Sequence, residues 1–141
     1  EGLDVGDVIY ADDGRLSFAV EHFEPTEIHC TVIVGGVLGS KKGINIPNVR
    51  STKSSVTEKD RRDIAFGIDI AADYFAMSFV RHPGDVVEAK SLAGNIPVIA
   101  KIEKPEAIEY LEPICDIADG LMVARGDLGI EAGFEKVPLL Q

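Results

Sequence analysis

The chain has 141 residues, about the length of one ordinary domain, and its composition, 45% hydrophobic and 27% charged, is typical of a folded globular protein. With 14 basic and 24 acidic residues the net charge is −10, which argues against nucleic acid or an anionic membrane surface as the main partner. The sequence has no apolar run of the roughly 20 residues that span a bilayer, and its first residues, EGLDVGD, do not resemble a signal peptide.

The cysteines and histidines show no pattern of a disulfide or a metal site. Cys30 and Cys115 lie far apart and lack CxxC spacing, so we expect two free core residues in a reducing compartment, and a cytoplasmic protein. His22, His29 and His82 are scattered, without the spacing of metal ligands. Four phenylalanines are also expected in the core: Phe18, Phe23, Phe75 and Phe79.

The first third of the chain has the period of β-strands. Apolar residues over 8–10 and 16–20 flank a turn of Asp and Gly at 12–14, which predicts a hairpin. Apolar residues at alternate positions over 28–34 predict a further half-buried strand. The basic segment 39–43, GSKKG, lacks the spacing of a P-loop, so it is interpreted as a solvated loop rather than a phosphate-binding loop.

The rest of the chain alternates helix and strand. The polar letters NVRSTKSS at 48–55 predict a hinge, and we place a linker at 51–56, between a β module over 1–50 and a βα region over 57–141. Thr57 and Asp60 resemble a capping box, which predicts a helix that buries a face with Ile64, Ile68 and Ala71. The later expected elements are strands over 74–80, 97–103 and 120–125, helices over 83–94 and 105–112 (ended or kinked by Pro113), and a turn over 126–129.

Three such helix–strand units favour a parallel sheet whose strands are buried on both faces. Strands of this kind occur in open doubly wound sheets and in (β/α)₈ barrels. A complete barrel needs about 250 residues, so on the barrel interpretation the sequence is a fragment.

Two groups of residues could carry chemistry at the ends of these strands. Lys101 and Glu103 alternate along one strand and therefore share a face at its carboxyl end, where they could serve a phosphoryl group and a metal ion. A structural ion pair is the alternative. Gly126 and Gly129 would let backbone N–H groups approach an anion, and Asp127 could complete a Mg²⁺ site with Glu103. The alternative here is an ordinary Asp–Gly turn before a helix.

Five stretches together resemble the pyruvate kinase family, in the family's order and spacing. They are DDGRLSFAV at 12–20, LGSKKGINIP at 38–47, AMSFVR at 76–81, IPVIAKIEKPEAI at 96–108 and DGLMVARGDLGIE at 119–131. The resemblance implies an α/β fold: a partial (β/α)₈ TIM barrel over 57–141, with the later part of an inserted all-β lid domain over 1–50.

The resemblance also implies an activity, the transfer of phosphate from phosphoenolpyruvate to ADP with Mg²⁺ (or Mn²⁺) and K⁺. Carried over residue by residue, Lys101 is the catalytic lysine that holds the phosphoryl group, and Glu103 and Asp127 are the metal ligands. The amides of Gly126 and Asp127 meet the substrate carboxylate, and Lys42 contacts the nucleotide. The family's K⁺ ligands lie outside this chain, so we expect the isolated chain to be inactive. The resemblance also implies that the whole enzyme is a homotetramer.

Two alternatives stay open from the sequence. One is a Mg²⁺-dependent, enolate-forming barrel lyase, which is not expected to carry the lid stretches with DDG and GSKKG. The other is a non-catalytic, domain-level fragment that folds or associates without turnover.

Overall fold

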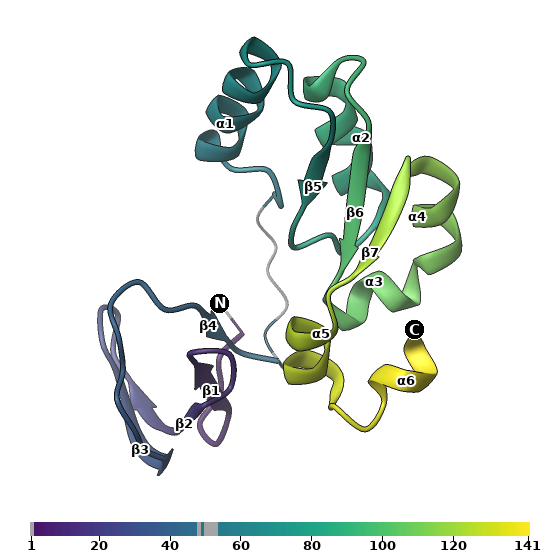
Figure 1. The fold of residues 1–141 in the computed structure, drawn as a ribbon. Helices are drawn as coiled ribbons and strands as arrows, with labels where there is room; N and C mark the ends of the chain where they lie inside the picture. The colour runs from purple at the N-terminus through teal and green to yellow at the C-terminus, as the bar shows by residue number, and fades with distance from the viewer. Residues whose placement is uncertain (1, 48, 50–53) are drawn as a thin grey trace.

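The computed structural model describes residues 2–47, 49 and 54–141, which form a small β module and a larger α/β module (Figure 1). The expected hinge over 48–55 falls mostly on residues outside this description, and so does half of the expected linker over 51–56. No helix in the described part of the chain is long and apolar enough to cross a membrane.

The small module is one antiparallel sheet with the strand order β3-β2-β1-β4. Its strands are β1 (Val8–Ala11), β2 (Leu16–Phe23), β3 (Ile28–Val34) and β4 (Ile44–Asn45). The predicted hairpin is confirmed, because β1 and β2 pair with Ala11 opposite Leu16. Gly14 in their turn has φ +79°, and a Cβ there would lie 3.4 Å from Cγ1 of Ile130 in the larger module, so glycine suits this close approach.

Several side chains that we expected to be buried are not. Strand β3 exists, but it is an edge strand on which only Cys30 is even half-buried, so the expectation of a half-buried strand is wrong. Phe18 and Phe75 are half-buried, whereas Phe23 is 49% and Phe79 57% exposed. Both cysteines are free as expected, although Cys30 is only partly covered and Cys115 is exposed. A pattern of apolar residues predicts which residues lie on the same face of a strand or helix. It does not predict whether another element packs against that face and buries it.

The larger module has a parallel sheet with the strand order β5-β6-β7 and helices around it. Its strands are β5 (Phe75–Met77), β6 (Val98–Ile102) and β7 (Gly120–Val123), and its helices are α1 (Glu58–Asp69), α2 (Pro83–Ala93), α3 (Pro105–Glu109), α4 (Leu111–Ile117), α5 (Arg125–Ala132) and α6 (Val137–Leu140). The predicted alternation of helix and strand is therefore confirmed. Figure 1 shows helices α2 and α4 beside the sheet and α5 at the end of β7.

One face of β6 provides the core. Alternate residues of this strand, Val98, Ala100 and Ile102, are almost completely buried. The two core clusters contain Val80, Val86, Ala100, Ile102, Ala107 and Ile114 in one, and Val56, Ala89, Ala93 and Val98 in the other. The opposite face carries the partly exposed Ile99 and Lys101, so the expectation of burial on both faces is wrong for the described chain. This open face is where the strand presents its charged residue.

Two helix boundaries differ from the prediction. The helix expected over 105–112 is broken at Tyr110 into α3 and α4. Pro113 does not end it; it lies in the first turn of α4, where a missing N–H costs little. The turn expected over 126–129 is the beginning of helix α5.

Helix α1 begins at the predicted capping box but buries a different position. The backbone N–H of Asp60 donates to the hydroxyl of Thr57, and the carboxylate of Asp60 accepts from the N–H of Thr57 at 2.8 Å. Ile64 is half-buried, whereas Ile68 and Ala71 are exposed. The buried position is Gly67, where a Cβ would overlap the ring of Phe75, so the close approach of helix and strand needs glycine.

Replacement of Thr57 by Ala is expected to lower the free energy of unfolding by about 1 kcal/mol, because one backbone N–H of α1 loses its acceptor. Urea denaturation measures the change. Thr26→Ala, in the exposed turn between β2 and β3, is the matched control. An equal effect of the two substitutions would contradict the capping role.

Candidate active site

A lysine and a carboxylate meet at the carboxyl end of the parallel sheet. Lys101, on β6, places Nζ 2.9 Å from Oε2 of Glu103, which follows the same strand. The Lys101 ammonium also donates to Oγ of Ser78, just after β5, at 2.9 Å. The structure thus brings the two predicted residues together and adds Ser78, which the sequence interpretation did not single out although it lies in the stretch AMSFVR.

Glu103 is held almost completely inside the protein. It is 3% exposed, and its Oε1 accepts a hydrogen bond of 2.7 Å from the backbone N–H of Phe79. Its other oxygen, Oε2, faces the Lys101 ammonium, but no donor among the described residues meets hydrogen-bond geometry there. A buried carboxylate oxygen with unused acceptor capacity is a suitable ligand for a hard cation such as Mg²⁺ or Mn²⁺.

Asp127 brings a second carboxylate toward this edge from the first turn of α5. Burial raises the pKa of Asp127, and the negative charge of Glu103 raises it further, while Lys101 acts in the opposite direction. Asp13 and Glu131 add smaller effects that also raise this pKa. Because a divalent cation would relieve the repulsion between the two carboxylates, the donor set fits Mg²⁺ or Mn²⁺.

The start of α5 also directs backbone donors to the end of β7. The first bond within the helix runs from the N–H of Leu128 to the carbonyl of Ala124, at 2.9 Å. The N–H groups of Gly126 and Asp127 precede it, so they have no acceptor in the preceding turn of the helix. Such a helix start favours a negatively charged group, as expected for a substrate carboxylate.

Lys42, the predicted nucleotide residue, belongs to the small module. Its Nζ lies 2.6 Å from Oδ1 of Asp12, in the turn after β1. The hydrogen bond with Lys42 holds the pKa of the Asp12 carboxyl below its usual value; burial opposes this, and the charges of Lys42 and Arg15 add to the lowering. Lys41 and Lys42 also line an open pocket with the strands around Phe18. The described contacts place Lys42 with Asp12 and not in the cluster around Lys101.

Glu131, on α5, connects the two modules. Its side chain is 2% exposed, and its Oε1 lies 2.6 Å from Nζ of Lys104, which follows Glu103 in sequence. The same oxygen accepts a hydrogen bond of 2.9 Å from Nδ2 of Asn45, on β4. One buried carboxylate therefore fixes the helix that carries Asp127 both to the loop after β6 and to the small module.

Substitution of Glu131 by Ala is expected to lower the free energy of unfolding by about 3 kcal/mol, because the mostly buried Lys104 then lacks its partner charge. Urea denaturation again measures the effect. Glu112→Ala, on the exposed face of α4, is the control and should stay within about 0.5 kcal/mol of the parent chain. A loss no larger than that of the control would contradict the connecting role of Glu131.

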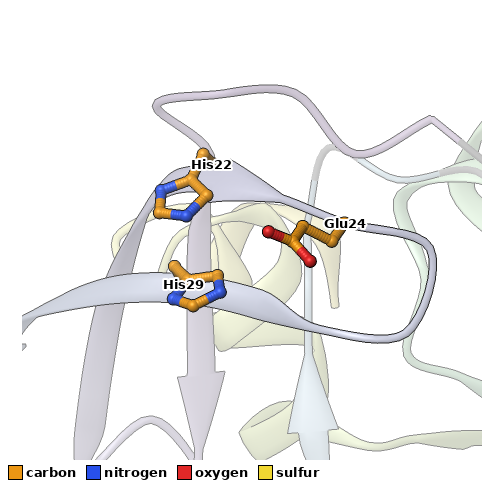
Figure 2. A group of neighbouring side chains, drawn as sticks. All are labelled: His22, Glu24 and His29. Carbon is orange, nitrogen blue, oxygen red and sulfur yellow. The ribbon is translucent and has the colours of Figure 1, made fainter.

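The histidine interpretation needs a correction. His22 and His29, which appear scattered in the sequence, lie side by side across β2 and β3, and Glu24 joins them (Figure 2). His22 and His29 are seven residues apart, and each lies two residues from a glutamate of the turn between them, His22 from Glu24 and His29 from Glu27. That symmetry about the turn is the signal in the sequence that could have found the pair.

The larger module has parallel βα units, and it carries a lysine and carboxylates at the carboxyl edge of its sheet. It is an α/β domain of the kind that builds its sites at that edge. A family model described as "Pyruvate kinase, barrel domain" matches residues 1–141. The chain therefore belongs to the pyruvate kinase family.

Curated relatives agree with this assignment. Pyruvate kinase 2 of Synechocystis sp. is 49% identical over 94% of this chain, and the pyruvate kinase of Geobacillus stearothermophilus is 47% identical over all of it. The pyruvate kinase of Clostridium perfringens is 42% identical, again over the whole chain. The matched segments cover 24%, 25% and 31% of these three proteins, so the chain spans between a quarter and a third of their length.

Proposed function

We propose that this chain provides the phosphoryl-transfer site of a glycolytic pyruvate kinase, which converts phosphoenolpyruvate and ADP to pyruvate and ATP. The observation that carries the proposal is the group formed by Lys101, Glu103 and Asp127 at the carboxyl edge of the parallel sheet. It combines one cationic donor with two carboxylates that repel one another. Membership of the pyruvate kinase family supports this assignment.

In this proposal the Lys101 ammonium contacts the transferring phosphoryl group and the developing enolate oxygen. Phosphoryl transfer depends mainly on positioning and on electrostatic stabilisation of charge. Ser78 and Glu103 orient the lysine through contacts of 2.9 Å each, and the amides of Gly126 and Asp127 bind the substrate carboxylate. The contacts with Ser78 and Glu103 thus hold the lysine in place before substrate binds.

Glu103 and Asp127 would hold the Mg²⁺ or Mn²⁺ ion. When bound, that ion neutralises negative charge on the phosphoryl oxygens. The buried Oε2 of Glu103, which keeps acceptor capacity beside Lys101, and the raised pKa of Asp127 are the two features of this chain that support the assignment. The residues that bind K⁺ in this family lie in segments of the enzyme outside residues 1–141.

The two sheets have separate roles in this proposal. The parallel strands over 57–141 form part of a (β/α)₈ barrel, and the β module over 1–50 is the later part of the inserted lid, with the linker at 51–56. In the described chain β5 and β7 each pair only with β6, so both sides of the sheet are free to continue into further strands. Phe66 on α1 and Ile70, which directly follows this helix, are exposed apolar residues that such neighbouring elements would cover.

The remaining assignments concern partners and location. Lys42, whose side chain is 41% exposed beside Asp12, presents positive charge to the nucleotide phosphates. The pocket next to it has apolar walls, which suit the adenine base. We expect the whole enzyme to be a cytoplasmic homotetramer.

A chimaera tests the proposal. Residues 1–141 would replace the matching segment of the Geobacillus stearothermophilus pyruvate kinase, with which they share 47% identity. We expect this protein to form pyruvate from phosphoenolpyruvate only when ADP and Mg²⁺ are present. A chimaera that keeps the circular dichroism spectrum and oligomeric state of the parent enzyme but has no turnover would contradict the proposal.

A further inference from the structure

The end of the β2–β3 hairpin gathers three side chains that can bind a metal ion. One ligand atom from each of His22, Glu24 and His29 lies within 4.8 Å of those of the other two. The two imidazole rings are stacked, with centroids 4.1 Å apart and planes 11° from parallel. Figure 2 shows the Glu24 carboxylate beside this pair, where the chain leaves β2.

The backbone fixes this arrangement. His22 pairs directly with His29 in the antiparallel register, next to an irregularity between Val20 and His22, and such an irregularity re-aims side chains at the end of a ladder. The turn that follows is closed by a hydrogen bond of 2.8 Å from the N–H of Glu24 to the carbonyl of Glu27. The positions of the three ligand-bearing residues are therefore set before any ion binds.

The charges around the pair favour a cation. Oε2 of Glu27 lies 3.5 Å from Nε2 of His29, and the carboxylate of Glu21 accepts a hydrogen bond from Thr31 on the neighbouring strand. Glu24 and Glu27 thus place two carboxylates beside the two imidazoles, in a chain whose net charge is −10. Positive ions are attracted to such a field.

We propose that His22, Glu24 and His29 bind a divalent transition-metal ion of the Zn²⁺ type. Two imidazole nitrogens and one carboxylate oxygen, with water in a fourth position, form the donor set of an open zinc site. At the usual bond length, tetrahedral Zn²⁺ ligands lie roughly 3.4 Å apart. The three ligand atoms lie within 4.8 Å of one another, and the three side chains are exposed. Rotation about their side-chain bonds can therefore bring these atoms to the shorter distance without movement of the strands.

This site differs from the carboxylate pair at the active site in its chemistry and in its position. Imidazole nitrogen suits zinc, nickel and copper, whereas Mg²⁺ and Mn²⁺ favour oxygen ligands such as Glu103 and Asp127. The β2–β3 hairpin lies in the small module (Figure 1), whereas Glu103 follows β6 and Asp127 lies in the first turn of α5. An ion on the hairpin would join β2, β3 and their turn, so it should stabilise the end of the small module.

The test measures Zn²⁺ affinity by competition with a chromophoric chelator, with Co²⁺ absorption as a second readout. Millimolar Mg²⁺ is present throughout, so that it competes with Zn²⁺ for the carboxylates of Glu103 and Asp127. Because thiols are good zinc ligands, all variants carry Cys30→Ala and Cys115→Ser, which remove the two free cysteines. In this background we expect one equivalent of Zn²⁺ to bind per chain, together with visible Co²⁺ bands from a coordination number below six.

Single substitutions locate the site. His22→Gln and His29→Gln should each weaken Zn²⁺ binding at least about tenfold, since each removes one of three protein ligands, and Glu24→Gln should weaken it less. His82→Gln, which changes the third histidine at the start of α2, is the matched control and should leave the affinity unchanged. Absence of binding, an unchanged affinity in either hairpin variant, or an equal loss in the His82 variant would overturn the proposal.

Discussion

Replacement of Lys101 by Met in the chimaeric enzyme is expected to lower kcat by about 10³-fold or more, because a preorganised charged donor disappears from the reacting phosphoryl group. Methionine keeps most of the side-chain volume and removes only the charge and the hydrogen bond to Ser78. The KM for phosphoenolpyruvate should change less than kcat, since the lost interaction is strongest in the transition state. Steady-state kinetics of pyruvate formation provide the measurement.

The control for this substitution is Lys59→Met. Lys59 lies on the exposed surface of α1, where it pairs with Asp63, and its loss should leave kcat within twofold of the parent. If the Lys101 variant kept full turnover, Lys101 could not be the catalytic lysine. If both variants lost activity equally, the effect would reflect folding rather than catalysis.

The second large effect concerns the cation. We expect Glu103→Gln and Asp127→Asn each to weaken Mn²⁺ binding to the 141-residue chain by about 10- to 100-fold, as measured by electron paramagnetic resonance of free Mn²⁺. Both substitutions preserve shape and remove charge. Glu106→Gln, on α3, is the control, and binding that survives in the Glu103 and Asp127 variants would exclude these carboxylates as ligands.

The same titration should depend on pH in a defined direction. Burial and the neighbouring Glu103 charge raise the pKa of Asp127, so protons compete with Mn²⁺ at a higher pH than for an ordinary carboxyl. Because the pKa of Asp127 is raised in the folded state, its protonated carboxyl adds to the free energy of unfolding. This contribution is lost as the pH rises through the folded-state pKa. Without cation at neutral pH, Asp127→Asn should therefore not destabilise the chain, whereas a large loss of stability would contradict this electrostatic picture.

Local patterns in the sequence predict most of the elements. The hairpin around Gly14 and the capping box at Thr57 each depend on residues a few positions apart, and the structure contains both. Tyr110 and Pro113 show the limit of such patterns: the sequence places the end of a helix at the proline, but the chain breaks earlier and uses the proline to begin the next helix. Local preference allows the helix to end at either residue, and tertiary packing places the break at Tyr110.

The candidate site divides in the same way. The approach of Lys101 to Glu103 follows from the alternation of side chains along one strand, so the sequence predicts it. The contact with Ser78 depends on the pairing of β5 with β6, and that of His22 with His29 depends on a hairpin register that includes an irregularity. Neither register can be obtained from the residues of one strand alone, which explains why both contacts were missed.

The junction between the two modules combines an attraction with a repulsion. Asn45 holds the small module to Glu131, while Asp13, in the turn of the same module, adds negative charge at Asp127. A divalent ion bound to Asp127 would reduce this repulsion and leave the hydrogen bond of Asn45 intact, so we expect the distance between the modules to depend on cation concentration. Small-angle X-ray scattering should then report a smaller radius of gyration with Mn²⁺ than without it, and an unchanged radius would contradict this effect of the cation on the junction.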